Sequence, residues 1–505
     1  MNRRGRTKHR SAIKFTALLL VLFLLTPFPG AAGQQGQGSQ AGQSLKGAKL
    51  KGKVPVNKEL LKVKLPRAQE TALENGLRVI LLENHKVPTF SMQMTILSGG
   101  LSDPADHPGL ASTTAALLRE GTGKRTSREI AEQVDSLGAT LTAGSGLSTF
   151  TSAVSASGLV ENLDQMLEIF ADVIRNPGFP KEEVEKYKSR TVSQRQFLKS
   201  NPGFLAQNRF SRAIYGNHPA GQVVAPVDAI NKTMPEDLAQ FHSKHYLPNN
   251  AMLSIVGDVT LKEIMPKIER AFGDWKQGEV PKTTIPEVPT PSKAKIHLID
   301  RPASVQTYIV LGDLGITRTD PDYFSLLLMN KIVGGGPASR LFMNLREDKG
   351  YTYGAYSSFS GTKHRGTWTA SSSVRTEVTD AAMKEFMYEL NRIRDEKVPA
   401  EELENAKRSL IGSFALSLEQ PQSLLSNIVI QKLYNLPADY WDTYPQKVAA
   451  ITAEDVHRAA QKYVDLKHLQ IVAVGDASKI NKDMAAYGEM EVYDREGKLV
   501  KSADQ

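Results

Sequence analysis

The sequence predicts an α/β (α+β) fold made of two homologous domains in tandem, each a mixed β-sheet flanked by helices. The first observation behind this prediction is an internal duplication. An offset of 218 residues relates Asp237 to Asp455 and Asp258 to Asp476, together with the similar residues around them. Repeats of solenoid proteins are only about 20 to 50 residues long, so a period of this length indicates two whole domains.

Two further observations support the duplication and place its boundaries. Residues 179–185 resemble residues 398–404, at an offset of 219. A proline-rich segment, typical of a semi-extended linker, separates the two copies. We therefore expect a signal peptide over 1–33, a leader over 34–67, domains over 68–278 and 295–490, a linker over 279–294 and a C-terminal tail over 491–505.

Hydrophobic periodicity predicts several elements inside the domains. Residues 77–82 and 92–96 read as strands. Apolar residues from Leu159 to Ile174 recur at helical spacing, and this run stops at an Asn-Pro pair. The second copy has a similar helical stripe over 383–393. A Val-Gly-Asp sequence ends a strand in each copy, and we expect its glycine to form a turn.

The first 33 residues have the pattern of a secretory signal peptide. Six basic residues precede an apolar run over 15–28 and a set of small residues. The run is short for a bilayer, which disfavours the alternative of an uncleaved anchor. We expect an exported protein, periplasmic or secreted, with no integral membrane segment after cleavage. The absence of cysteine excludes disulfides and a lipoprotein anchor.

The net charge of +9 is concentrated at the N-terminus. Six basic residues lie in the signal peptide, and the Gln- and Gly-rich leader over 34–67 adds eight more against one acidic residue. The body from Ala68 onward is mildly acidic, at −4. We expect the leader to be disordered before about residue 60. This distribution argues against nucleic acid as the partner.

One segment of the second copy could carry chemistry. Residues 334–353 read GGGPASRLFMNLREDKGYTY, with Arg346 and Tyr353 seven positions apart. An Arg and a Tyr held together can grip a carbonyl oxygen and stabilise charge that develops on it. The alternative is structural: Arg346 pairs with Glu347 or Asp348, and Tyr353 packs on a strand.

This segment resembles the C-terminal signature of the insulinase/pitrilysin family of zinc peptidases, and the resemblance extends over about residues 70 to 490. It implies that the two domains form one half of a clam-shell chamber. It also implies that Arg346 and Tyr353 hold substrate carbonyls. The turn of Gly334, Gly335 and Gly336 would then let the backbone approach the chamber.

The family's zinc motif, H-x-x-E-H, is replaced in this chain. Its two His positions correspond to Ser112 and Ala116, and its Glu position corresponds to Ala115. The third ligand falls near Ser193 or Gln194, and no Asp or Glu occurs between residues 186 and 227. The resemblance therefore implies a degenerate metal site and no cofactor in this chain, with zinc in a partner subunit.

Other sites receive weaker support. His242 and His245 are three residues apart and could bind a metal from one helix, but we favour surface histidines. A thiol nucleophile is impossible without cysteine, and no H-E-x-x-H, G-x-S-x-G or Walker lysine is present. Residues 138–149 match the family's edge strand, where Thr142 and Ala143 would bind substrate by strand addition. The alternative is an ordinary strand without a ligand.

These observations lead to one main reading and two alternatives. The chain is expected to be the non-catalytic subunit of a heterodimeric zinc metalloendopeptidase. Inactive alone, it would support a homologous partner that bears the zinc motif and acts on peptides or unfolded polypeptides. The first alternative is a structural or assembly module without any role in hydrolysis. The second is an independently active peptidase with a relocated metal site.

Overall fold

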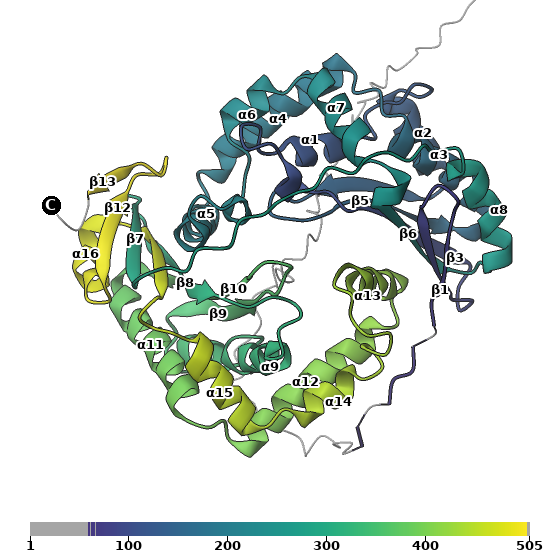
Figure 1. Cartoon of the computed structure of the whole chain (residues 1–505). Helices are drawn as coiled ribbons and strands as arrows, with labels where there is room; N and C mark the ends of the chain where they lie inside the picture. The colour runs from purple at the N-terminus through teal and green to yellow at the C-terminus, as the bar shows by residue number, and fades with distance from the viewer. Residues whose placement is uncertain (1–58, 61, 66, 502–505) are drawn as a thin grey trace, which may run out of the picture.

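The computed structural model describes residues 59–501 except 61 and 66. The predicted signal peptide and most of the predicted leader therefore lie outside the described residues. The described chain forms two domains that lie opposite each other, each with one sheet and a layer of helices (Figure 1).

The first domain begins with three strands and continues with helices before and after a β-hairpin. Its elements are β1 (Gln69–Ala72), β2 (Arg78–Glu83), β3 (Thr89–Ile96), α1 (Leu110–Leu117), α2 (Ser127–Ser136), β4 (Thr140–Ser145), β5 (Ser152–Leu159), α3 (Leu163–Arg175), α4 (Lys181–Leu198), α5 (Pro202–Tyr215), α6 (Val227–Lys232), α7 (Pro235–His245), β6 (Ala251–Gly257) and α8 (Leu261–Phe272).

The second domain repeats this order after the linker and adds two strands at its end. Its elements are β7 (Lys295–Asp300), β8 (Gln306–Leu314), α9 (Tyr323–Val333), α10 (Arg340–Phe342), the π-helix η5 (Met343–Asp348), β9 (Thr352–Phe359), β10 (Thr367–Arg375), α11 (Thr379–Asp395), α12 (Ala400–Ser417), α13 (Pro421–Leu433), α14 (Tyr444–Ala450), α15 (Ala453–Tyr463), β11 (Gln470–Gly475), α16 (Ala477–Ala485), β12 (Glu489–Tyr493) and β13 (Leu499–Lys501).

The strand orders confirm the duplication. The first sheet has the order β1-β2-β6-β3-β5-β4, and the second has β13-β12-β7-β11-β8-β10-β9. The five shared strands follow the same order in both sheets. Among these five strands, the first in the chain pairs in parallel with the last, which is β2 with β6 in one sheet and β7 with β11 in the other. The other pairs among the five are antiparallel. The predicted mixed α/β architecture of two homologous domains is therefore correct.

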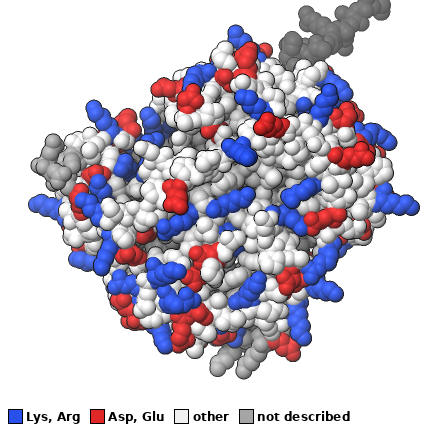
Figure 2. Space-filling model, in the orientation of Figure 1, with Lys and Arg blue, Asp and Glu red and all other residues white. Residues whose placement is uncertain are grey.

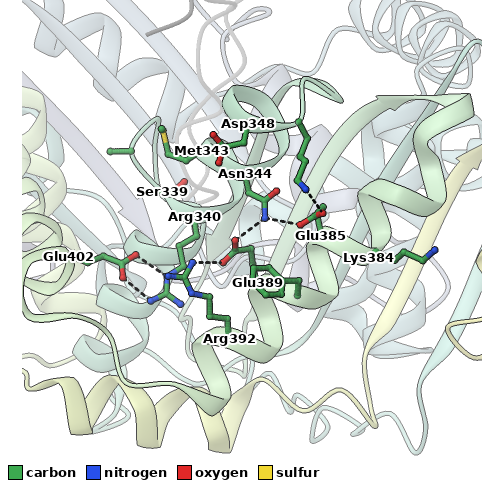
Figure 3. Close-up of a pocket in the computed structure, with 13 residues that line it drawn as sticks. Ser339, Arg340, Met343, Asn344, Asp348, Lys384, Glu385, Glu389, Arg392 and Glu402 are labelled. Carbon is green, nitrogen blue, oxygen red and sulfur yellow. Dashed lines mark hydrogen bonds and ion pairs between the residues drawn. The ribbon is translucent and has the colours of Figure 1, made fainter. Parts of the chain in front are cut away.

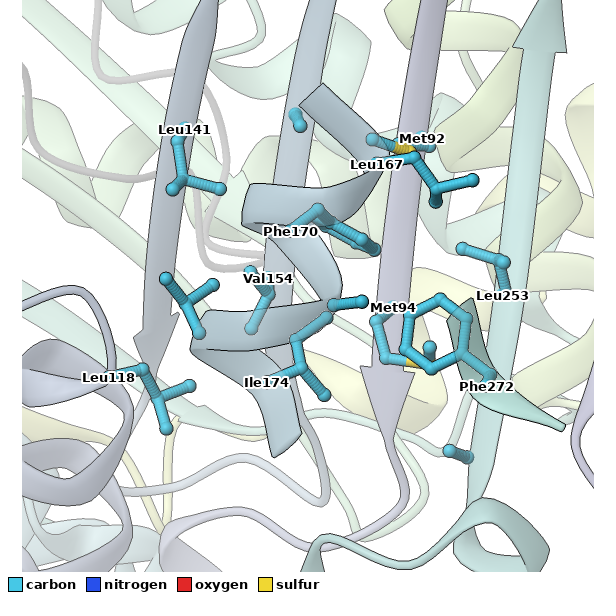
Figure 4. Packing of buried hydrophobic residues seen from close by; sticks show 14 of the residues in the cluster. Met92, Met94, Leu118, Leu141, Val154, Leu167, Phe170, Ile174, Leu253 and Phe272 are labelled. Carbon is cyan, nitrogen blue, oxygen red and sulfur yellow. The ribbon is translucent and has the colours of Figure 1, made fainter. Parts of the chain in front are cut away.

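Each sheet buries one face under helices of its own domain. In the first domain, α3 and α8 cover this face, and Phe170 and Phe272 pack against Met94 and Leu253 (Figure 4). These rings meet edge to face, with centroids 6.4 Å apart. The predicted stripe of the second copy forms the same layer in α11, where Phe386 is buried. Burial of these large side chains supplies most of the stability of each domain.

The opposite face of each sheet is covered by a helix of the other domain. Helix α5 leaves the first domain and packs on β8 and β11, where Phe210 and Ile214 join Val310 and Val472. Its counterpart α13 leaves the second domain and packs on β3 and β6. All seven residues of β6 and all six of β11 are buried as a result. The two domains exchange equivalent helices.

Polar contacts reinforce this exchange. The guanidinium of Arg209 in α5 lies 3.9 Å from the ring centre of Tyr493 in β12 and donates to His297 of β7. At the other contact, Lys86 of the first domain pairs with Glu419, just before α13, at 3.1 Å. Such exposed pairs add little stability singly, so apolar burial dominates the contact between the domains.

Several predicted boundaries differ from the structure. Leu159 ends strand β5 and is not part of the helix that follows, because α3 begins at Leu163. The predicted tail from 491 contains most of β12 and all of β13, which extend the second sheet. The predicted leader ends in a segment that packs on the second domain, where the backbone N–H of Leu65 donates to Asp442 at 2.9 Å.

The glycine of each Val-Gly-Asp sequence also has a different role from the predicted turn. A Cβ atom on Gly257 would lie 2.5 Å from the carbonyl oxygen of Thr89, and one on Gly475 would lie 2.9 Å from Oγ1 of Thr307. Gly257 is needed because the backbone of β3 approaches closely, whereas Gly475 leaves room for the side chains of Thr307 and Ile480. The prediction of a turn was wrong for both positions.

Removing apolar contacts from the exchanged helices should destabilise the whole chain. We expect Phe210→Ala in α5 to lower the free energy of unfolding by about 3 to 5 kcal/mol, and Leu425→Ala in α13 by about 2 to 5 kcal/mol. Urea denaturation followed by circular dichroism measures both. Phe197→Ala, at a side chain that is 73% exposed, is the control and should change stability by less than about 0.5 kcal/mol. A loss confined to one domain, seen as two separate transitions, would contradict this account.

Candidate functional site

Arg346 lies in the π-helix η5, which continues directly from α10. Its guanidinium lies over the ring of Phe342, 4.7 Å from the ring centre, and its Nε is 3.5 Å from Oε1 of Glu347. The pairing with Glu347 proposed as a structural alternative is therefore present, although at long range. A π-helix is uncommon and frequently occurs at functional sites.

Tyr353 lies at the start of β9, and its side chain is 83% exposed. Strand β9 pairs with β10 as Thr352 with Val374 and Ala355 with Ser372, so two residues of β9 oppose one residue of β10. This β-bulge interrupts the alternation of side chains along the strand. Ala355 faces the core, and without the bulge Tyr353 would share its face. The bulge thus turns Tyr353 out into solvent.

Two hydroxyl groups hold the bulge in place. The Oγ1 of Thr352 donates to the carbonyl of Ser373 at 2.7 Å, and the Oγ of Ser372 donates to the carbonyl of Gly354 at 2.9 Å. Both carbonyls belong to the interrupted part of the ladder. Local hydrogen bonds within the strand pair therefore fix the exposed position of Tyr353.

Arg346 and Tyr353 are connected through short segments. The chain passes from η5 to β9 through Gly350, whose φ of +63° closes the helix. The ring of Phe342, which supports Arg346, lies 5.6 Å from the ring of Tyr356, three residues after Tyr353 in β9. Phe342 thus links the helix that carries the arginine to the strand that carries the tyrosine.

The glycine turn before α10 packs against β9. The carbonyl of Gly334 accepts from the backbone N–H of Ser357 at 3.0 Å, and a Cβ atom on Gly334 would lie 2.1 Å from that nitrogen. Gly335 approaches the backbone of Lys331 in a similar way, and Gly336 has a φ of +156°. Gly334 permits the close approach to strand β9, which thereby receives support on its outer edge, whereas Gly335 packs against α9.

Helix α1 carries the degenerate zinc positions. Ser112 and Ala116 are partly exposed one turn apart, whereas Ala115 is buried. None of the three side chains can bind zinc or accept a proton. Ser193 and Gln194 are exposed on α4, a helix that contacts α1. Within residues 59–501, leaving aside 61 and 66, no group of three or more His, Asp or Glu side chains could hold a metal ion.

The two histidines of α7 are not at the surface, and the prediction of surface histidines was wrong. His242 donates from Nε2 to the carbonyl of Ile174 at 2.7 Å and stacks on Tyr246. The Nδ1 atom of His245 lies 3.0 Å from Oγ of Ser98. Burial lowers the pKa of His242 to about 4 and also lowers the pKa of His245. Both are neutral packing residues whose nitrogens contact backbone or hydroxyl groups.

Strand β4 forms one edge of the first sheet and pairs with β5. Thr142 and Ala143 lie in this strand and are partly buried. Arg119 donates from Nη1 to the carbonyl of Leu141 at 2.8 Å, which occupies one backbone group of the edge. The predicted edge strand is present, and whether it binds substrate remains a prediction.

The surface adds two observations. Lysine and arginine side chains are interspersed with aspartate and glutamate over the face shown in Figure 2, without one dominant sign. In the part of the chain that the structure describes, no helix is long and apolar enough to cross a membrane.

Comparison with known families decides the identity of the fold. Residues 78–226 match the insulinase model (peptidase family M16), and residues 233–410 match the model of the peptidase M16 inactive domain. This chain belongs to the insulinase family. With Ser112, Ala115 and Ala116 at the zinc positions, it is of the family's inactive type.

Individual relatives agree with this assignment. An uncharacterized zinc protease, YmxG, of Bacillus subtilis is 25% identical over 70% of this chain and 85% of its own length. A non-peptidase homolog of Helicobacter pylori is 22% identical over 79% of this chain and 92% of its own length.

Solved structures of the family have the same fold. The crystal structure of a peptidase M16 inactive domain from Pseudomonas fluorescens has a TM-score of 0.75 and 28% identity, and the match covers 81% of this chain and 97% of that one. The periplasmic protease PqqL of Escherichia coli has a TM-score of 0.69 and 16% identity, and the match covers 85% of this chain but only 51% of that one.

The burial of His242 predicts an acid-sensitive contribution to stability. The folded pKa lies near 4 and the unfolded value near 6.5, so protons bind the unfolded chain first and stability is lost as the pH falls from about 6.5 to 4. Lowering the pH from 7.5 to 5 should decrease the free energy of unfolding of His242→Gln by about 2 kcal/mol less than that of wild type. Urea denaturation at the two pH values measures both. His85→Gln, at an exposed histidine whose pKa is raised by Asp258, is the control. Equal losses in wild type and His242→Gln would contradict the assignment.

The exposed face of α1 predicts that a metal site can be partly rebuilt. Ser112→His combined with Ala116→His places two imidazoles one helical turn apart, and we expect this variant to bind Zn²⁺ more tightly than wild type. Calorimetric titration with ZnCl₂ measures the affinity, and Ser112→His alone is the control. The assignment would be wrong if the double variant bound zinc no better than the single one.

Proposed function

We propose that this chain is the non-catalytic subunit of an exported, heterodimeric insulinase-family peptidase, and that Arg346 and Tyr353 serve the zinc site of its partner. The observation that carries the proposal is the exposed Tyr353, which a hydrogen-bonded bulge turns away from the core beside the helix of Arg346. A structural module would gain nothing from holding a tyrosine almost fully in solvent, because burying that ring would stabilise the fold.

The roles of the two side chains follow from their chemistry. The guanidinium and the phenol hydroxyl both donate hydrogen bonds, and both can hold a peptide carbonyl or the oxyanion that replaces it during hydrolysis. The zinc of the partner would activate the attacking water. The carbonyl of Gly334 binds the outer edge of β9 through Ser357, so that Arg346 and Tyr353 would be positioned before substrate arrives.

The partner is proposed to be a homologous chain with an intact H-x-x-E-H motif. The match to PqqL supports this, since this chain corresponds to about half of that polypeptide and to 98% of its crystallised first half. A second chain would therefore supply the other half of the chamber. Peptides or unfolded polypeptides would enter the chamber and add a strand to the edge of β4 near Thr142 and Ala143.

A second candidate function is a structural or assembly role without hydrolysis. The replaced zinc positions and the match to a non-peptidase homolog favour it. It predicts a stable complex with a partner but no peptide hydrolysis by that complex. The proposed enzyme component instead predicts hydrolysis that a chelator abolishes.

Variants of the two donors test the proposal. The chain is co-expressed with the zinc-motif homologue of its own organism, and hydrolysis of an unfolded fluorescent casein is measured. We expect Arg346→Ala and Tyr353→Phe each to lower kcat by roughly 10²- to 10³-fold, as loss of an oxyanion donor does, without changing complex formation or zinc content. Tyr356→Phe, which removes a neighbouring hydroxyl from the same strand, is the matched control.

The other results are also informative. If both variants hydrolyse casein as fast as wild type, Arg346 and Tyr353 have no part in catalysis. If a stable wild-type complex hydrolyses no peptide at all, the structural role is correct and the proposal fails.

A further inference from the structure

A pocket of about 740 Å³ lies in the helical layer of the second domain, on the side of the sheet opposite α5. Figure 3 shows the side chains that line it. It is formed by α10, the π-helix η5, α11 and the start of α12. Four basic and four acidic side chains line it, so it favours neither anions nor cations. None of these residues belongs to the candidate site described above.

Arg340 contributes a buried donor to this pocket. Its side chain is only 3% exposed, and Nε and Nη2 both donate to the carboxylate of Glu402, at 2.8 and 2.7 Å. This bidentate pair occupies one edge of the guanidinium and turns Nη1 away from Glu402. Nη1 is buried and has no hydrogen-bond partner among the described residues.

Asn344 contributes a buried acceptor. Its Nδ2 donates to Glu385 at 3.0 Å and to Glu389 at 2.9 Å. Carboxylates only accept, so the orientation of the amide is fixed and Oδ1 must face away from both. Asn344 is 9% exposed, and its Oδ1 has no partner within the described part of the chain. A buried polar atom without a partner destabilises the fold, so a ligand that supplies the missing hydrogen bond would be favoured.

The first domain provides an internal comparison. A smaller pocket of about 420 Å³ lies between the loop before α2 and the start of α4, the counterpart of α12. Its arginine, Arg125, is fully engaged by Glu168 and Asp172 at 2.6 and 2.7 Å. No buried side-chain atom among its described lining residues is without a partner. Among the described residues, the unpartnered donor and acceptor therefore distinguish this pocket from its counterpart in the first domain.

These groups define the chemistry of a ligand. Arg340 Nη1 requires a carboxylate or carbonyl oxygen, whereas Asn344 Oδ1 requires an N–H donor. Phosphate offers mainly acceptor oxygens and would leave Asn344 Oδ1 without a donor, whereas a simple cation would leave Arg340 Nη1 without an acceptor. We propose that this pocket binds a zwitterion with an ammonium and a carboxylate group, either a free amino acid or a short peptide. The exposed Tyr388 and Met343 at its rim would contact an apolar side chain.

The position of the pocket suggests what binding would change. Asn344 and Arg346 lie in the same π-helix, with Asn344 in the pocket and Arg346 over Phe342. A ligand held by Asn344 would stabilise the helix from the pocket side. Protection of the amides of residues 343–349 from hydrogen exchange should therefore increase when the pocket is filled.

Binding to the full chain tests the proposal without any partner or activity. Three probes are titrated by calorimetry and thermal shift: a pool of free amino acids, a pool of tripeptides with free N-termini, and the same tripeptides acetylated at the N-terminus. We expect one of the first two pools to bind saturably and the acetylated pool not to bind. The pool that binds identifies free amino acids or peptides as the ligand.

Two variants locate the binding. Ala338→Trp places a large ring in the pocket from an exposed position and should lower the affinity at least tenfold without disturbing the buried pairs. Gly123→Trp makes the same change in the counterpart pocket, where no atom lies within 4 Å of the new Cβ, and should leave binding unchanged. The proposal is overturned if no pool binds, if the acetylated peptides bind equally well, or if Ala338→Trp binds like wild type.

Discussion

The reciprocal exchange of α5 and α13 is the contact on which the rest of this structure depends. Each sheet has helices of its own domain on one face only, and its other face would expose the apolar side chains of its central strands to water. A helix from the opposite domain covers that face in both cases. Because each helix leaves its own domain to do so, neither sheet is covered on both faces unless the two domains are together. We therefore expect the two domains to unfold as one cooperative unit.

This constraint explains how the candidate site can be rigid although its residues lie at an edge. Strand β8 is held by α5, β10 pairs with β8, and β9 pairs with β10. The bulge at Tyr353 and the turn at Gly334 then fix the last strand from two sides. If Arg346 and Tyr353 act as the proposed donor pair, this scaffold would hold their geometry before substrate binds, as electrostatic stabilisation of a transition state requires.

Much of the architecture could be predicted from the sequence, because it is recorded in local patterns. The repeat of Asp237 at Asp455 placed both domains, and the apolar stripes marked α3 and α11. The zinc positions on α1 could be located only through the resemblance to the family, whose flanking residues match those around Ser112 and Ala116. Signals of this kind depend only on residues close together in the chain.

Other features depend on contacts between distant residues and could not be predicted in this way. The apolar residues of α5 do not indicate which sheet they cover. The bulge at Tyr353 follows from its register with β10, and the burial of His242 follows from a carbonyl 68 residues away. The strands β12 and β13 were missed because their short segments gain stability only in the sheet, where β12 pairs with β7 and β13 pairs with β12.

We propose above all that the chain has no zinc of its own and completes the site of a homologous subunit. The most direct test titrates the purified chain into the zinc-motif homologue while zinc content and casein hydrolysis are measured together. We expect no zinc in this chain alone, activity that rises until one equivalent has been added, and one zinc per pair. Stoichiometric zinc or chelator-sensitive hydrolysis in the isolated chain, or partner activity that this chain leaves unchanged, would contradict it.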